Sequence, residues 1–115
     1  MTEPTASSHI LVITSSNGNI TAKKIANELV ESGAAACVQV LPKVYSVFRW
    51  KNQVDHEEEH LLLIKTLASK YAAVEKTIKM HHPYEVPEIV SLPIIGGSSE
   101  YLDWLSQMVS TTHAK

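Results

Sequence analysis

Eight residues, His81 to Glu88, form the densest group of side chains in this sequence that could do chemistry. They are His-His-Pro-Tyr-Glu-Val-Pro-Glu, which places two imidazoles, a phenol and two carboxylates around two prolines. Imidazole together with carboxylate suits several divalent metal ions. Adjacent helical residues point in different directions, so at most one of the two histidines can join a given site. The candidate metal ligands are His81, His82, Glu85 and Glu88, together with the distant Cys37.

The competing interpretation of this segment is architectural. Pro83 and Pro87 forbid continuation of a helix, so the segment ends one helix and leads into the next strand. His82 then caps the exposed carbonyl groups at the helix end, and the two glutamates bond backbone amides in the turn. Two histidines without regular ligand spacing are a weak metal signal, and this favours architecture.

Other polar groups carry weaker signals. Cys37 lies inside an apolar strand pattern, which is typical of a small buried hydrophobe rather than a nucleophile. The run Thr14-Ser15-Ser16 stands between a strand and a helix, where helix amides can bind anions, but it has no glycine-rich spacing. The acidic run Asp55 to Glu59 could collect cations, and a solvated strand end explains it as well.

The composition is that of an ordinary globular domain. The chain has 115 residues, 44% of them hydrophobic and 19% charged, with a formal net charge of −2. We expect one domain over 1–115, with flexible tails at 1–8 and 111–115. The charge gives no reason to expect nucleic acid or an anionic membrane as partner. One cysteine and a polar start without a hydrophobic signal core predict a soluble intracellular protein.

The secondary structure follows from apolar spacing and turn residues. Gly33 ends the first helix, Pro42 predicts a bend or bulge in the second strand, and Pro93 predicts an edge position or a bulge in the last strand. The expected strands are Ile10–Ile13, Cys37–Trp50, Val54–Thr66 and Ile89–Ile95. The expected helices are Ile20–Ser32 with Asn19 as N-cap, Ser69–His81, and Ser99–Val109 with Ser98 as cap.

This order predicts a ferredoxin-like α+β fold. The sequence β-α-β-β-α-β gives an antiparallel sheet with two helices on one face, and a C-terminal helix is appended. The turn Lys51-Asn52-Gln53 joins two strands too long for so small a core. The hairpin is apolar on both faces, so we expect another subunit to cover the sheet's open face. Tyr45, Phe48 and Trp50 on a sheet invite comparison with RNA-recognition domains, but acidic neighbours and the absence of their glycine-aromatic motif argue against it.

A set of motifs along the chain resembles the CutA-like divalent-cation tolerance family from Ile10 to Trp104. The most specific is the string His82 to Ile89, His-Pro-Tyr-Glu-Val-Pro-Glu-Ile. The other matching pieces are Ala35-Ala36-Cys37-Val38, Pro42 with Ser46 and Trp50, Glu59 with Lys65-Thr66, and Tyr101-Leu102 with Trp104.

The resemblance implies a ferredoxin-like, non-enzymatic, cytoplasmic homotrimer with a role in tolerance to copper and other divalent cations. Its overall design is also similar to that of the trimeric PII signalling proteins. It implies that Cys37 is structural and that the metal ligands are His82 and Glu88, with His81 as a neighbour. The residues expected at an inter-subunit cleft or interface are Phe48, Trp50, Lys65, Tyr84 and Glu85.

The sequence departs from the family pattern at two places. A cysteine proposed as a copper ligand in some relatives is replaced by Thr14, so a thiolate-containing copper site does not transfer whole. Around the hairpin turn the chain has Arg49-Trp50-Lys51-Asn52-Gln53, where the family commonly has an aromatic residue before Trp50 and Glu-Gly after it. The leading hypothesis is a homotrimer that binds divalent cations, with Cu(II) as the candidate ion, through His82 and nearby carboxylates between subunits. The alternative is a PII-like module that binds a small ligand or protein partner in inter-subunit clefts.

Overall fold

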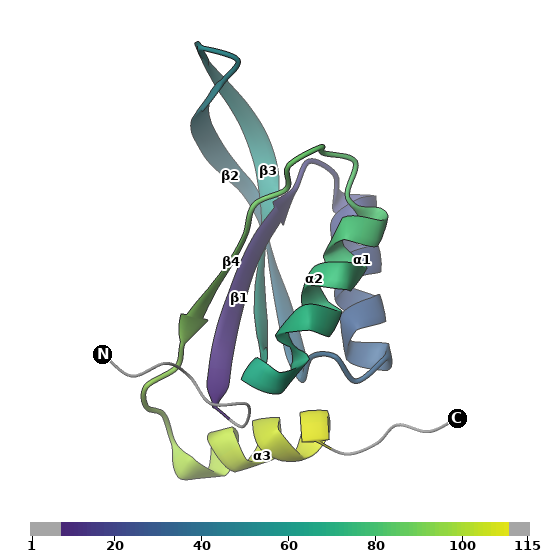
Figure 1. Ribbon diagram of the computed structural model, residues 1–115, viewed down its shortest axis with the longest axis vertical. Helices are drawn as coiled ribbons and strands as arrows, with labels where there is room; N and C mark the ends of the chain where they lie inside the picture. The colour runs from purple at the N-terminus through teal and green to yellow at the C-terminus, as the bar shows by residue number, and fades with distance from the viewer. Residues whose placement is uncertain (1–7, 111–115) are drawn as a thin grey trace.

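The computed structural model describes residues 8–110 and shows the predicted order of elements (Figure 1). The predicted flexible tails lie outside the described residues except for Ser8, whose carbonyl oxygen accepts a hydrogen bond from the Ala68 amide at 2.8 Å. The elements are β1 (His9–Ser16), α1 (Asn19–Glu31), β2 (Cys37–Trp50), β3 (Gln53–Leu67), a 3-10 turn (Ala68–Lys70), α2 (Tyr71–His81), β4 (Ile89–Pro93) and α3 (Ser99–Ser110).

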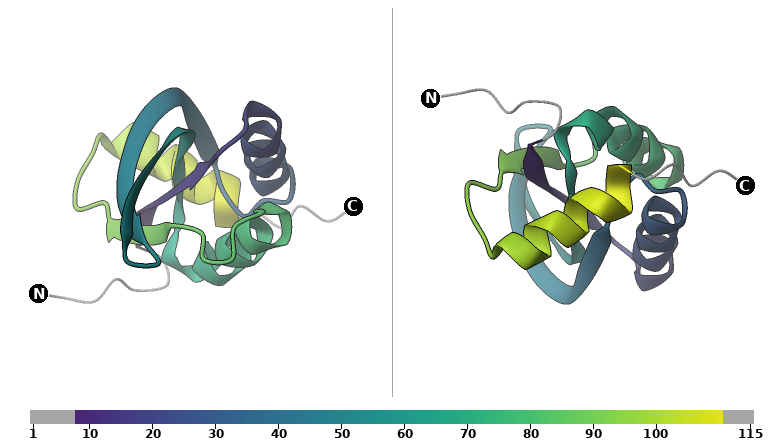
Figure 2. Two further views of the ribbon diagram at one scale, coloured as in Figure 1. Left: turned by 90° about the horizontal axis from the view of Figure 1, so that it is seen from above. Right: turned by 90° about the horizontal axis from the view of Figure 1, so that it is seen from below.

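The four strands form one antiparallel sheet in the order β2-β3-β1-β4. Helices α1 and α2 lie side by side on one face, and α3 lies across one end of the sheet (Figures 1 and 2). This confirms the predicted ferredoxin-like α+β fold. Strand β4 is at an edge, so Pro93 removes no ladder hydrogen bond from the sheet interior.

The core fills the space between the sheet and the two helices. Its members include Ile10, Val12, Leu62 and Ile64 from the strands and Ile25, Leu29, Val74 and Ile78 from the helices. Helix α1 buries Ala22, Ile25 and Leu29, which lie at helical spacing, whereas Val30 is 42% exposed. Gly33 has φ 82°, the left-handed conformation that favours glycine after a helix end.

Strand β1 is longer than its apolar run predicts. It continues through Thr14, Ser15 and Ser16, which pair with β3 and are at most 3% exposed. These two buried hydroxyls have partners within the chain, because Thr14 donates to the Glu88 carbonyl oxygen at 2.6 Å and Ser16 to the Gly18 carbonyl oxygen at 3.4 Å. Polar side chains with internal partners can thus continue a buried strand.

Other predicted boundaries shift by a few residues. Gly18, not Asn19, is the N-cap of α1, and no side chain caps that helix. Helix α2 begins at Tyr71, because the 3-10 turn takes up the residues before it. Strand β4 ends at Pro93, although the Ile94 amide still bonds the His9 carbonyl oxygen at 2.9 Å.

The β2–β3 hairpin extends well beyond the core (Figure 1). Its strands have 14 and 15 residues, and the register shifts between Leu41 and Val44, as Pro42 predicts. The turn is tighter than predicted, because Gln53 already pairs with Trp50. Lys51 and Asn52 have φ values of 51° and 64°, the pair of positive angles that a two-residue hairpin turn of type I′ requires.

Helix α3 closes the far end of the sheet. The Ser98 hydroxyl accepts from the Tyr101 amide at 3.2 Å, which confirms the predicted cap. A small second core forms from Ala36, Leu67, Leu105 and Val109. The apolar side of α3 is only partly buried, because Tyr101 and Met108 are 39% and 38% exposed.

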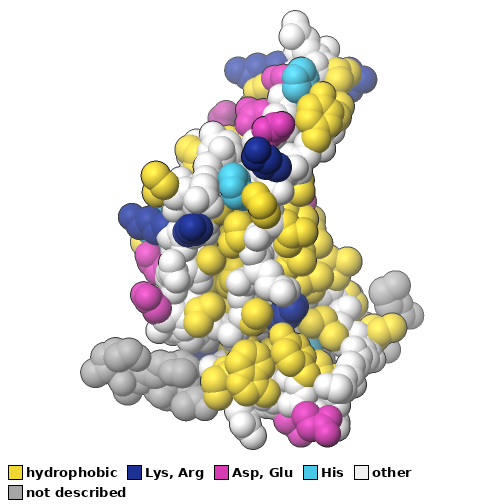
Figure 3. All heavy atoms as spheres, turned by 180° about the vertical axis from the view of Figure 1, so that it is seen from behind, with side chains coloured by type: hydrophobic (Ala, Val, Ile, Leu, Met, Phe, Trp, Pro, Cys, Tyr) yellow, Lys and Arg dark blue, Asp and Glu magenta, His cyan; other side chains and the backbone are white. Residues whose placement is uncertain are grey.

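The second face of the sheet carries hydrophobic side chains and faces outward (Figure 3). Register and alternation place on this face Leu11, Ile13, Leu61, Leu63, Val90 and Leu92. Val90 and Leu92 are 47% and 43% exposed. A broad exposed apolar area of this kind marks an interaction surface.

Candidate functional site

The segment from His82 to Glu88 connects α2 to β4 beside the base of the hairpin. The His82 amide donates to the Ile78 carbonyl oxygen at 2.9 Å, and the chain then turns extended, with φ −85° and ψ 132° at His82. Pro83 follows at once and prevents another helical turn. The predicted joint between helix and strand is therefore present.

Both ring nitrogens of His82 are engaged in hydrogen bonds. Nε2 lies 2.5 Å from the Ser15 carbonyl oxygen, and Nδ1 lies 3.2 Å from the Tyr84 amide nitrogen. A carbonyl must accept and an amide must donate, so the ring is neutral with its proton on Nε2. The ring also packs against Tyr84, with centroids 4.6 Å apart. His82 thus fastens the segment to the end of β1, and neither nitrogen has a lone pair free for a metal ion.

The structure separates His81 from the rest of the predicted ligand set. Its Nε2 lies 3.0 Å from Oε2 of Glu28, so the side chain links α2 to α1. Glu88 lies near the end of β1, with Oε1 accepting from the Ser15 hydroxyl at a long 3.5 Å. Within residues 8–110, no three His, Cys, Asp or Glu side chains converge as a set that could hold a metal ion.

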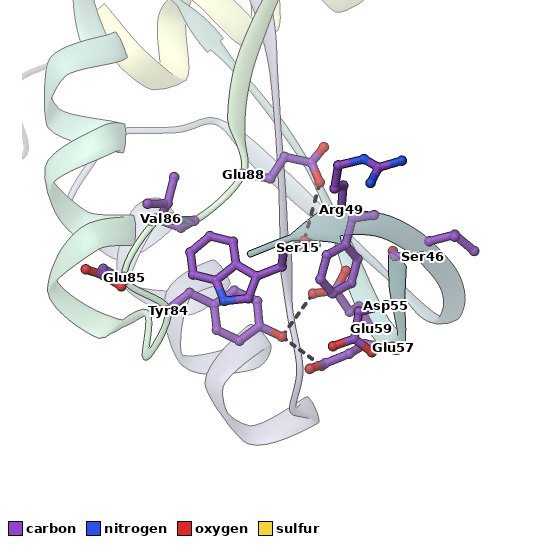
Figure 4. Close-up of a pocket in the computed structure, with 14 residues that line it drawn as sticks. Ser15, Ser46, Arg49, Asp55, Glu57, Glu59, Tyr84, Glu85, Val86 and Glu88 are labelled. Atoms are coloured by element: carbon purple, nitrogen blue, oxygen red, sulfur yellow. Dashed lines mark hydrogen bonds between the residues drawn. The ribbon is translucent and has the colours of Figure 1, made fainter. Parts of the chain in front are cut away.

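Instead, the segment lines one side of a pocket, and the hairpin lines the opposite side (Figure 4). The cavity has a volume of about 720 Å³. Its polar lining residues are Ser15, Ser46, Arg49, Asp55, Glu57, Glu59, Tyr84, Glu85 and Glu88, and its apolar ones are Val47, Phe48, Trp50, Val86 and Pro87. Predicted cleft residues Phe48, Trp50, Tyr84 and Glu85 are therefore brought together.

Lys65, also predicted for the cleft, lies elsewhere. Its Nζ donates to Oε1 of Gln39 at 2.8 Å and lies 5.7 Å from the ring centroid of Tyr101. These contacts place it on the open sheet face near α3 rather than at the pocket. Cys37 is opposite Lys65 in the β2–β3 register and is a free, partly buried thiol.

A phenol between two carboxylates forms the polar floor of the pocket. The Tyr84 hydroxyl oxygen lies 3.0 Å from Oε1 of Glu57 and 3.1 Å from Oε2 of Glu59 (Figure 4). Glu59 is only 7% exposed. Burial, followed by the hydrogen bonds to Glu57 and Glu59, raises the pKa of the Tyr84 phenol above its ordinary value. The phenol therefore stays neutral near pH 7.

The two glutamates share one side of the hairpin because of strand alternation. Glu57 and Glu59 are two residues apart on β3, and they pair with Ser46 and Val44 of β2. Glu58 points to the opposite side with Tyr45 and is exposed. Our sequence interpretation of this acidic run as a solvated strand end is wrong at Glu59. The spacing of Glu57 and Glu59, two residues apart, was the available signal that they share one side of the strand. The phenol that covers Glu59 belongs to Tyr84, 25 residues away in the sequence.

The pocket has an excess of negative charge. Five of the lining side chains are carboxylates, and Arg49 is the only cationic one among them. In Figure 4 the Arg49 guanidinium lies at the Glu88 end and points away from Glu57 and Glu59, and Glu85 points away from that pair as well. Within the described part of the chain, Arg49 makes no ion pair. The floor of the pocket therefore attracts cations.

Comparison with known proteins identifies the family. The family described as "CutA1 divalent ion tolerance protein" matches residues 10–108. The chain belongs to the CutA1 family. The family match spans the resemblance seen in the motifs from Ile10 to Trp104.

Individual CutA1 relatives agree with this assignment. The chain is 46% identical over 86 residues to the divalent-cation tolerance protein CutA of Thermus thermophilus, covering 75% of this chain and 84% of the relative. It is 35% identical over 97 residues to the protein of that name from Pectobacterium atrosepticum, covering 84% and 88%. The Protein CutA homolog of Xenopus laevis is 46% identical over 88 residues, but this match covers 58% of that protein's length.

Solved CutA1 structures have the same fold. The T. thermophilus protein superimposes with a TM-score of 0.86 at 40% identity, over 88% of this chain and 98% of that one. CutA1 from Shewanella sp. SIB1 gives a TM-score of 0.89 at 35% identity, over 96% and 100%. No helix within residues 8–110 has the length and apolar character needed to cross a membrane.

Proposed function

We propose that this CutA1 protein is a non-enzymatic homotrimer that acts in divalent-cation tolerance and binds divalent cations in the acidic pocket. The observation that carries the proposal is the position of the Tyr84 hydroxyl between Glu57 and Glu59. A hydroxyl has one proton, so it can donate to only one of two ionised carboxylates. A cation held beside the pair would relieve the repulsion that remains.

The ligand set of one chain is incomplete for such an ion. Hard divalent cations take six or more oxygen ligands, and Glu57 and Glu59 supply two carboxylates. We propose that water and a neighbouring copy complete the shell. Carboxylate and water ligands suit Mg²⁺, Ca²⁺ and Mn²⁺, whereas Cu(II) is better served by imidazole. Copper binding is therefore tied to a second candidate site at His82 and Glu88, with His81 as neighbour.

That second site has a structural cost. Coordination through His82 would break its bond to the Ser15 carbonyl oxygen or its bond from the Tyr84 amide. His81 would have to leave Glu28 to join it. The oxygen site leaves these bonds of His81 and His82 intact, and we therefore favour it.

The proposal of a homotrimer is supported by two surfaces. The open sheet face exposes Val90 and Leu92, and the hairpin tip exposes Val47 and Val54 at 61% and 68%. Burial of such areas against other copies removes apolar surface from water. The number three comes from the family resemblance. A cytoplasmic location is proposed on the free thiol of Cys37, which suits a reducing compartment.

Isothermal titration with Mn(II) and Cu(II) tests the proposal. We expect Glu59→Gln to weaken Mn(II) binding by about tenfold or more, since an amide oxygen is a poor substitute for a carboxylate. Glu58→Gln, one residue away on the other side of β3, is the matched control and should bind as the wild type does. If Glu59→Gln keeps wild-type affinity while His82→Gln abolishes Cu(II) binding, the site lies at His82 and Glu88 instead.

A second candidate function is a PII-like signalling module that binds a small ligand. The observation in its favour is the apolar wall of the pocket, formed by residues that include Phe48, Trp50 and Val86. A bare metal ion gains little from such a wall. A thermal-shift screen of metals against small metabolites separates the two functions, because a ligand that prefers the folded state raises the melting temperature.

A further inference from the structure

The pocket has two chemically different sides. Its floor is the polar group of Glu57, Glu59 and Tyr84, and its wall holds the aromatic rings of Phe48 and Trp50. Phe48 and Trp50 are 38% and 44% exposed, so each ring still has surface available for contact. The volume of about 720 Å³ lies within the range of small-molecule sites.

The carboxylates of the floor can accept further hydrogen bonds. The single proton of the Tyr84 hydroxyl serves one of its two carboxylate neighbours, at 3.0 or 3.1 Å. The raised pKa of Tyr84 keeps this proton in place. An ammonium or guanidinium group brings several N–H donors and a positive charge, and both match the carboxylates.

The wall adds a requirement that a metal ion does not meet. Aromatic faces attract cations, and aromatic and aliphatic surfaces also gain from burial against an apolar body. An organic cation uses the floor and the wall together. It also needs no fixed coordination shell, which residues 8–110 do not assemble.

We propose that this pocket binds a small organic cation, namely a primary ammonium or guanidinium group attached to an apolar body. The charged group lies against Glu57 and Glu59, and the body lies against Phe48 and Trp50. The inference rests on the pocket proposed above as a cation site and names the class of ligand that fills it. Organic and divalent cations then compete for the same carboxylates.

A set of three isosteric probes tests the charge requirement. We would titrate the wild-type protein with 2-phenylethylamine, 2-phenylethanol and phenylacetate at constant ionic strength, by calorimetry and by thermal shift. The amine should bind, and the affinity of the alcohol should be lower than that of the amine by about tenfold or more. The anion should not bind. Equal affinity for amine and alcohol, or no binding of the amine, overturns the proposal.

Two pairs of variants test the location. Glu59→Gln should lower amine affinity by about tenfold, while Glu58→Gln should leave it unchanged. Trp50→Ser should lower it as well, while Trp104→Ser on α3 should not; these indoles are 44% and 40% exposed. Glu59→Gln keeps an oxygen that can accept from Tyr84, so the fold should survive, and a far-ultraviolet melting curve checks this. Wild-type amine affinity in Glu59→Gln or Trp50→Ser contradicts the assignment.

A parallel titration with Mn(II) distinguishes this inference from the proposed function. Binding of Mn(II) without binding of the amine means that the pocket takes divalent ions and that the organic ligand is wrong. Binding of the amine without binding of Mn(II) supports the inference and contradicts divalent-ion binding at the pocket. If both bind, Mn(II) should displace the amine; simultaneous binding without competition overturns a shared site.

Discussion

The hydroxyl of Tyr84 lies 3.1 Å from Oε2 of Glu59, a residue that is only 7% exposed. This contact joins the segment before β4 to the middle of β3, and so it connects the two sides of the pocket. It also gives a buried carboxylate a donor, without which its burial would be costly. The same two residues therefore support both the architecture and the proposed chemistry.

Removal of the Tyr84 hydroxyl should destabilise the fold. In Tyr84→Phe, Glu57 and the buried Glu59 lose the donor that they share, and we expect the free energy of unfolding to fall by about 1–3 kcal/mol. Tyr45→Phe, on the opposite side of the hairpin and 65% exposed, should change it by less than about 0.5 kcal/mol. Urea denaturation at pH 7 measures both. Equal effects would mean that the Tyr84 contact does not contribute to stability.

Alkaline pH should affect the wild type more than Tyr84→Phe. Burial and the bonds to Glu57 and Glu59 raise the pKa of Tyr84 in the folded state, so the unfolded chain loses this proton first as pH rises above about 10. The unfolded state is then favoured, and the free energy of unfolding declines with pH.

The comparison with Tyr84→Phe isolates this effect. The pKa of Tyr71 is also raised, by burial and then by its bond to Glu75, but Tyr71 is present in both proteins. Denaturation at pH 9 and pH 11 should therefore show a steeper decline in wild type. Parallel declines would show that Tyr84 ionises alike in the folded and unfolded states.

Loss of the His82 ring should weaken the joint between α2 and β4. His82→Ala leaves the Ser15 carbonyl oxygen and the Tyr84 amide without their partner, and we expect a loss of about 1–3 kcal/mol in unfolding free energy. His56→Ala, at the exposed hairpin, serves as control because its ring contacts only Tyr45 among the described rings. A stability change no larger than that of His56→Ala would show that the His82 bonds are dispensable.

Charge on the open sheet face should disrupt the proposed assembly. Leu92→Lys places an ammonium group in the apolar area, and the molar mass from light scattering should fall toward that of one chain. Val30→Lys is the matched control, since Val30 is 42% and Leu92 43% exposed, but Val30 lies on α1 across the core. A mass unchanged in Leu92→Lys, or lowered equally in Val30→Lys, would contradict assembly through the sheet face.

Much of the fold could be predicted from local patterns. Apolar spacing predicted α1, α2 and α3, and four prolines indicated the irregularity in β2, the edge strand β4 and the joint after α2. The polar end of β1 could not be predicted in this way. Thr14 and Ser16 look like turn residues, and Ser16 does bond the carbonyl oxygen of nearby Gly18. The partner of Thr14, however, is the Glu88 carbonyl oxygen, which only the folded chain brings near.

The candidate site was less predictable, for a related reason. The His82–Glu88 motif led to a segment that lines the pocket, but sequence alone could not show that both His82 nitrogens are already bonded. Glu57 and Glu59 resemble solvated acids until Tyr84 packs over them. Strand alternation indicates which acids share a face, whereas long-range contacts determine which of them is buried.

The most direct test of the cation site is to locate a bound ion. Crystals soaked in Mn(II) and measured near the manganese absorption edge should show an anomalous peak within about 2.5 Å of a carboxylate oxygen of Glu57 or Glu59. The His82 ring should keep its bond to the Ser15 carbonyl oxygen in the same crystals. A peak on the His82 imidazole with that bond broken, or an acidic pocket without a peak at saturating Mn(II), would contradict the account.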